Sequence, residues 1–213
     1  SAVRVVTLLS LPALSSVFSP DQALAQSEAV VLRGGRLITV TQGTIEGGVL
    51  VMVDGRITAV GSEVVVPATA RVIDVSGKTV MPGLIDGFTN LGTVDYPSLG
   101  QDDDEATDPT TPQLRIIDGL NPDNRFIPLA RGAGVTTALA APAEGNLITG
   151  QSGLVELAGS TLEEMVVSFP VGVHVSLGEA PKLRYGGKNQ APMTRMGSAA
   201  LLRQTLVDAK AYG

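Results

Sequence analysis

The chain has 213 residues, of which 44% are hydrophobic, enough to bury a sizeable core and to exclude a disordered protein. It contains no Cys, which excludes disulfides, thiolate nucleophiles and zinc sites with Cys ligands. Its formal net charge is -6 and its Lys and Arg residues are scattered, so the charge pattern gives no indication of a nucleic-acid-binding surface.

The N-terminal segment has the pattern of a secretory signal peptide. Arg4 precedes an apolar run at residues 5–14, and a small-x-small site follows at residues 23–25. The apolar run is too short to span a bilayer, and the prolines of the segment disfavour the alternative, a buried N-terminal helix. We therefore expect residues 1–25 to be a signal peptide and the mature protein to be exported, to the periplasm or out of the cell.

Residues 26–79 contain short apolar runs separated by turn residues. Asp54-Gly55 stands between two such runs and favours a type I′ hairpin turn, because that turn needs positive φ at both central residues. Short strands at this regular spacing predict a small β-sandwich over residues 26–79.

The pattern changes at residue 80. Residues 80–85 and 134–141 are nearly continuous apolar runs, typical of parallel strands that are covered on both faces. A third run, at 166–177, alternates valines on one face with small polar residues and His174 on the other. The valine face should pack on helices and the polar face should line an interior, while residues 154–157 are expected to form an inserted strand.

Helices are expected between these strands. A short helix is predicted over residues 124–131 and another over 161–165, the latter with Thr161 as N-cap. A longer helix is predicted over residues 198–212, with Ser198 as its N-cap. Alternation of buried strands with helices predicts an α/β fold, either an open sheet or a barrel.

The most informative segment is residues 80–90, which read VMPGLIDGFTN. In an extended strand Asp86, Phe88 and Asn90 share one face. The segment resembles the start of the catalytic barrel in the metal-dependent amidohydrolase superfamily, where Pro-Gly-Leu-Ile-Asp leads into His-x-His. In this chain Phe88 and Asn90 stand in the places of the two histidines.

Other segments carry the same resemblance. Residues 53–61 and 73–78 resemble the sandwich that amidohydrolases place beside their barrel. Residues 145–151 and 192–197 resemble segments of exported, imidazolonepropionase-like amidohydrolases. The resemblance implies a β-sandwich domain at residues 26–79, followed over residues 80–213 by the first part of a (β/α)₈ barrel. A complete barrel of this kind needs about 250 residues, so we expect the chain to be the N-terminal part of a longer protein.

The resemblance also implies a reaction. It predicts a hydrolase that cleaves C–N bonds in an amide, cyclic amide or dipeptide-like small molecule, with a metal-bound hydroxide as nucleophile. Phe88 cannot bind a metal, and the amide oxygen of Asn90 is a weak ligand, better suited to calcium or magnesium than to zinc. Asn90 is therefore a weak metal-ligand candidate whose alternative role is to cap the strand end. The acidic run at residues 102–105 is a solvated loop or a cation site.

The remaining candidate residues lie farther along the chain. His174, the only histidine, and Glu179, the nearest carboxylate after it, form a candidate catalytic pair, although a lone histidine is often a core or surface residue. Asn146 and Gln151 offer amide groups to a polar substrate, or else belong to a Gly-rich turn. Arg184 lies in a basic segment suited to a substrate carboxylate, or to solvent.

Two functions follow from these residues. In the first, the intact protein is a hydrolase with a divergent metal site and a small-molecule substrate. In the second, the loss of both histidines has left a catalytically inactive binding or structural subunit. Both are compatible with a homo-oligomer.

Overall fold

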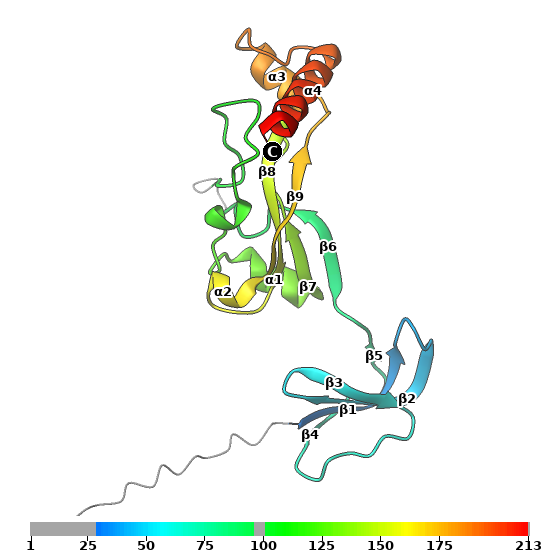
Figure 1. Ribbon diagram of the computed structural model, residues 1–213. Helices are drawn as coiled ribbons and strands as arrows, with labels where there is room; N and C mark the ends of the chain where they lie inside the picture. Colours follow the sequence, from blue (N-terminus) through cyan, green and yellow to red (C-terminus); the bar gives the residue numbers. More distant parts are fainter. Residues whose placement is uncertain (1–28, 96–100, 213) are drawn as a thin grey trace, which may run out of the picture. The chain divides into compact units, whose positions relative to one another are not determined.

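The computed structural model describes residues 29–95 and 101–212 (Figure 1). The segment predicted to be a signal peptide lies outside the described residues. The chain divides into two compact units, with the boundary between Met81 and Pro82. Among the described helices, none is long and apolar enough to cross a membrane.

The first unit is a five-stranded sheet with the order β3-β2-β1-β4, in which β5 also pairs with β1. Its strands are β1 (Ala29–Ile38), β2 (Thr44–Val53), β3 (Arg56–Gly61), β4 (Arg71–Asp74) and β5 (Thr79–Val80). Asp54 and Gly55 connect β2 to β3 with φ angles of 50° and 73°. The predicted type I′ turn is therefore confirmed.

The core of this unit differs from the predicted sandwich. The sheet buries Val31, Val49 and Val51. Val64 and Val66, in the connection from β3 to β4, cover these valines together with other residues around them. In the described residues a loop thus supplies the second layer, because the apolar run before Pro67 packs on the sheet without pairing as a strand.

The second unit contains a four-stranded sheet with the order β6-β7-β8-β9. Its strands are β6 (Leu84–Thr89), β7 (Val135–Ala140), β8 (Ile148–Glu156) and β9 (Val166–Val175). Its helices are the 3₁₀ turn η1 (Ile116–Gly119), α1 (Phe126–Gly132), α2 (Leu162–Met165), α3 (Ala180–Gly186) and α4 (Arg195–Tyr212). Helices and strands together confirm a mixed α/β class.

Strand direction places the ends of this sheet. β6 and β7 are parallel, and β8 is antiparallel to both β7 and β9. The carboxyl ends of β6, β7 and β9 therefore lie along one side of the sheet, together with the start of β8. This line of strand ends is the carboxyl edge of the sheet. The inserted strand predicted at residues 154–157 is longer than expected, because β8 already begins at Ile148 and pairs with β9 over much of its length.

The first residues of α2 and α4 can be compared with the N-caps predicted for these helices. The Thr161 hydroxyl accepts a hydrogen bond from the Glu164 N–H at 3.3 Å, which confirms Thr161 as the N-cap of α2. The predicted start of α4 at Ser198 is wrong, since the helix begins at Arg195. The Thr194 hydroxyl accepts from the Gly197 N–H at 3.1 Å and is the cap instead.

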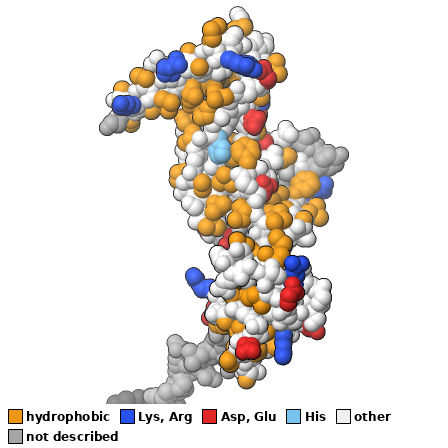
Figure 2. Space-filling view, turned by 90° about the vertical axis from the view of Figure 1, so that its right-hand side faces the viewer, with side chains coloured by type: hydrophobic (Ala, Val, Ile, Leu, Met, Phe, Trp, Pro, Cys, Tyr) orange, Lys and Arg blue, Asp and Glu red, His pale blue; other side chains and the backbone are white. Residues whose placement is uncertain are grey.

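The core of the second unit lies against one face of its sheet. It joins residues of η1, α1 and α2 to residues in or next to β7, β8 and β9, namely Ile116, Leu120, Ile127, Ala138, Ala140, Val155, Leu157 and Met165. Many hydrophobic side chains lie at the surface elsewhere (Figure 2). Val171, Val173 and Val175 of β9 are about half exposed, so the predicted packing of these valines on helices is absent from the described residues. Leu84 and Ile85 of β6 are exposed as well.

Gly83 in the Pro-Gly-Leu-Ile-Asp run has a packing role. The Leu84 N–H donates to the Gly134 carbonyl at 2.8 Å, which holds the start of β6 close to the start of β7. A Cβ atom at position 83 would lie 2.1 Å from the Thr136 hydroxyl oxygen. Only glycine fits at this approach without displacing Thr136.

Substitution of Gly83 tests this packing. Gly83→Ala should lower the free energy of unfolding by about 1–3 kcal/mol, because the added methyl group overlaps Thr136. Gly87→Ala is the matched control, since Gly87 lies four residues farther along, in β6, and a Cβ there meets nothing within 4 Å. Urea unfolding of the intact protein, followed by circular dichroism, measures both. Equal effects of the two substitutions would contradict the packing role.

Candidate active site at the carboxyl edge of the second sheet

A small hollow lies where the strand ends of the second unit meet. Phe88 from β6, Thr149 from β8 and His174 from β9 line it. Pro142 and Glu144, which follow β7, also line it. Segments far apart in the sequence thus converge at the edge that the strand directions define.

Phe88 and His174 touch across this edge. Their ring centroids are 5.4 Å apart and the ring planes are inclined at 58°. Because neighbouring strands lie about 4.8 Å apart, a flat four-stranded sheet would separate its edge strands by about 14 Å. The contact between a β6 and a β9 side chain therefore requires a curled sheet, over which the two rings reach toward each other.

His174 is half-buried and lies on the small polar face of β9, as predicted. Burial lowers the pKa of its imidazole below 6.5. Within the described ranges its ring nitrogens have no hydrogen-bond or ion-pair partner, and Phe88 is its ring contact. The neutral imidazole therefore has a lone pair available to accept a proton or to bind a metal.

The predicted catalytic partner of His174 lies elsewhere. The Glu179 carboxylate accepts from the Lys182 ammonium at 2.6 Å and lies 3.7 Å from the Arg195 guanidinium. The Lys182 hydrogen bond lowers the pKa of Glu179. No hydrogen bond joins Glu179 to His174 among the described residues. The carboxylate that shares the hollow with His174 is Glu144, which sequence proximity did not reveal.

Asn146 is buried rather than open to a substrate. Its side chain is 1% exposed and its Nδ2 donates to the Glu105 carbonyl at 2.5 Å and to the Thr111 hydroxyl at 3.0 Å. Its Oδ1 accepts from the Tyr185 hydroxyl at 2.6 Å. Three of the hydrogen bonds that an Asn amide can make are thus used inside the protein.

Gln151 and Arg184 also bind the chain itself. The Gln151 amide donates to the Pro112 carbonyl at 2.9 Å. The Arg184 guanidinium pairs with both carboxylate oxygens of Asp104, one of them at 2.7 Å, and this hydrogen bonding raises the pKa of Arg184. The groups predicted to bind substrate instead hold the segment that runs from residue 101 to residue 115.

Asn90 does not belong to a set of metal ligands in the described residues. Its Nδ2 donates to the Asp103 carboxylate at 3.0 Å. Its backbone carbonyl accepts from the N–H and the hydroxyl of Thr93. Nowhere in residues 29–95 and 101–212 do three His, Asp or Glu side chains gather so that they could hold a metal ion. With the Phe88 ring against His174, the donors present do not fit a zinc-type centre.

Thr149 has an unusual hydroxyl. The residue is 4% exposed, and its Oγ1 has no hydrogen-bond partner among the described groups. An unpaired buried hydroxyl costs about 1–3 kcal/mol, which a ligand that bonds to it would offset. The sequence singled out the segment around Thr149 for its glycines, but burial of the hydroxyl depends on residues far away in the sequence.

Comparison with known proteins identifies the family. No family model matches the chain. The amidohydrolase tasK of Hapsidospora irregularis is 31% identical over 169 residues, which cover 73% of this chain and 17% of that protein. A solved amidohydrolase from Thermotoga maritima MSB8 matches with a TM-score of 0.81 and 31% identity, over 86% of this chain and 48% of that chain. The chain belongs to the amidohydrolase superfamily.

Shorter matches agree with this membership. The imidazolonepropionase of Klebsiella pneumoniae is 44% identical over 73 residues, which cover 32% of this chain and 18% of that protein. The chain spans 17% and 18% of the two curated relatives and about half of the solved Thermotoga amidohydrolase. The predicted relationship is therefore confirmed for a chain shorter than its relatives.

The titration of His174 tests the hollow. Phe88→Ala should raise the pKa of His174 toward 6.5, because removal of the ring exposes the imidazole to water. Nuclear magnetic resonance titration measures the pKa, with the signal assigned by its loss in His174→Asn. Since the folded pKa lies below the unfolded value, the unfolded state takes up the proton first, and His174 should reduce stability progressively as pH falls below 6.5. A pKa unchanged by Phe88→Ala would contradict burial by that ring.

Removal of one hydroxyl tests the structural role of Asn146. Tyr185→Phe leaves the Asn146 Oδ1 without this donor and should lower the free energy of unfolding by about 1–3 kcal/mol. Tyr212→Phe is the matched control, because Tyr212 is 97% exposed. Thermal and urea unfolding measure both variants, and equal stability of the two would argue that Asn146 is free for another partner.

Proposed function

We propose that the intact protein is an amidohydrolase-type hydrolase that cleaves a C–N bond in a non-peptide amide, cyclic amide or dipeptide-like small molecule. The observation that carries the proposal is the placement of His174. Its neutral, unpaired imidazole shares a hollow with Glu144 at the carboxyl edge of parallel strands, in a chain of the amidohydrolase superfamily. Active sites lie at this edge in (β/α)₈ proteins.

The barrel is part of the proposal. β6, β7 and β9 run parallel, and the contact of Phe88 with His174 requires the sheet to curl. Both features support the second unit as the first part of a (β/α)₈ barrel. The pattern of residues 1–25 supports export of the mature protein, to the periplasm or out of the cell.

In the proposed hydrolysis the described residues would transfer protons. Hydrolysis of an amide needs an acceptor for the proton of the attacking water and a donor for the leaving nitrogen. His174 suits both steps, because an imidazole can accept and donate a proton and this ring lines the hollow. Glu144 offers a carboxylate at the rim of the same hollow.

The described donors set a limit on metal chemistry. Zinc centres in enzymes use three protein ligands, and His174 supplies one imidazole. Phe88 offers none, and the amide nitrogen of Asn90 is turned to Asp103. A metal-dependent reaction in the intact protein therefore requires ligands from outside the described residues.

The second candidate is a catalytically inactive binding or structural subunit. Its support is the Phe88 ring, which occupies a position where the superfamily motif has a histidine and rests against His174. An aromatic contact of this kind stabilises the sheet edge but carries no chemistry of its own.

Turnover by the intact protein separates the two candidates. On a panel of dipeptides, lactams and cyclic amides we expect hydrolysis, and His174→Asn should lower kcat by about 100-fold or more, because it removes the proton acceptor. Release of amine or carboxylate measures the rate. Tyr212→Phe, an exposed position, is the control for handling and folding.

The opposite result favours the inactive subunit. No turnover on the panel, with or without added zinc, would contradict the hydrolase. Phe88→His combined with Asn90→His restores the motif of the superfamily. Zinc-dependent turnover that appears only in this double variant would show that the natural protein has lost catalysis.

A further inference from the structure

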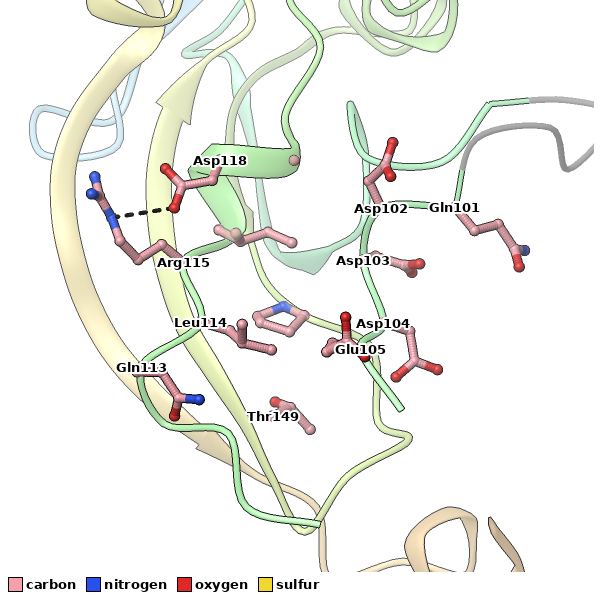
Figure 3. A pocket seen from close by; sticks show the side chains of 13 residues that line it. Gln101, Asp102, Asp103, Asp104, Glu105, Gln113, Leu114, Arg115, Asp118 and Thr149 are labelled. Atoms are coloured by element: carbon pink, nitrogen blue, oxygen red, sulfur yellow. Dashed lines mark ion pairs between the residues drawn. The ribbon is translucent and has the colours of Figure 1, made fainter. Parts of the chain in front are cut away.

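A second hollow of about 350 Å³ adjoins the His174 hollow and shares Pro142 and Thr149 with it. Figure 3 shows the acidic segment 101–105 along one wall and residues 113–118 along the other, with Thr149 between them in this view. Pockets for small organic ligands have volumes of about 300–1,000 Å³, so this hollow has the size of a ligand site.

The lining of this acidic pocket has excess negative charge. It contains five carboxylates and one guanidinium, namely Asp102, Asp103, Asp104, Glu105, Asp118 and Arg115. Arg115 is engaged on its own wall, 3.8 Å from the Asp118 carboxylate and 4.9 Å from the centre of the Phe169 ring. It therefore does not neutralise the opposite wall.

The acidic wall divides into bound and free carboxylates. Asp103 accepts from Asn90, and Asp104 pairs with Arg184. Among the described residues, the carboxylates of Asp102 and Glu105 have no hydrogen-bond or ion-pair partner. Two unpaired carboxylates in a hollow attract a cation.

The buried hydroxyl of Thr149 is an independent sign of a ligand. Thr149 is 4% exposed, it lines the acidic pocket, and its Oγ1 is the one buried side-chain oxygen or nitrogen of the described residues without a partner. Buried polar groups in proteins are nearly always hydrogen-bonded, so an unpaired hydroxyl at a pocket wall indicates a ligand that supplies the bond.

The ligand chemistry follows from the spread of the carboxylates. No three acidic side chains of the described ranges converge closely enough to hold a metal ion. Leu114, Ile116 and Pro142 add an apolar wall between the charges. A ligand that matches this lining has a positive charge and a short aliphatic part, which an inorganic cation lacks.

We propose that the acidic pocket binds a small organic cation, an ammonium or guanidinium group on a short aliphatic chain. Asp102 and Glu105 supply the opposite charge, Thr149 bonds to a polar group of the ligand, and Leu114 contacts its aliphatic part. This inference goes beyond the hydrolase and holds whether or not the intact protein turns over amides.

Isothermal titration of the intact protein with n-butylguanidinium and with its uncharged analogue n-butylurea tests the proposal. The guanidinium should bind about tenfold tighter or more, because the carboxylates of Asp102 and Glu105 attract its charge. Its affinity should fall as salt is raised, because salt screens the carboxylates. Equal affinity for the two probes would overturn the proposal, as would an affinity for the guanidinium that salt leaves unchanged.

Two double variants place the binding in the pocket. Asp102→Asn with Glu105→Gln should remove most of the preference for the cation. Glu156→Gln with Glu163→Gln is the matched control, because it removes the same charge from exposed side chains that do not line the pocket. Equal loss in both double variants, or no loss in the pocket variant, would overturn the site.

Thr149→Val separates binding from folding. The valine keeps the shape of the side chain but cannot hydrogen-bond, so affinity for n-butylguanidinium should fall severalfold while the unfolding temperature stays equal or rises. Unchanged affinity would show that the hydroxyl has no part in the site. Titration with Mg²⁺ alone completes the test: a pocket that binds Mg²⁺ and not the guanidinium would overturn the organic cation.

Discussion

Both hollows depend on the hydrogen bonds made by one buried side chain, that of Asn146. Its amide joins the carbonyl of Glu105, the hydroxyl of Thr111 and the hydroxyl of Tyr185 in α3. Residues 101–125 contain the helical turn η1 and meet β8 through isolated backbone bridges at Thr110–Ile148 and Arg115–Gln151. Side-chain bonds from β8, from the residues before it and from α3 hold the segment in its place.

Local features of the fold were predictable from the sequence, because they depend on neighbouring residues. The Asp54-Gly55 turn and the Thr161 cap follow from dihedral and capping preferences that act within a few positions. The glycines at the start of β8 argue against a strand, but pairing with β9 outweighs that preference. The sequence of α3 stands out for its basic residues, whereas the helix depends on the buried Tyr185.

The candidate site divides in the same way. The alternation of β9 placed His174 on the half-buried face, since the period of a strand is a local property. Glu179 is the nearest carboxylate after His174 in sequence, yet it pairs with Lys182 and Arg195 of the following helices instead. Glu144 and Thr149 line the same hollow as His174 because of the strand order, which one sequence does not reveal.

The close approach of Gly83 to Thr136 has a consequence for how such chains are recognised. The glycine is required by the room between two strands, and this requirement is the same in a protein that catalyses a reaction and in one that does not. A motif scan that treats Pro-Gly-Leu-Ile-Asp as a mark of enzymes would therefore collect inactive relatives along with active ones. Positions 88 and 90, where this chain has Phe and Asn in the places of the two histidines, are the ones that should decide such a classification.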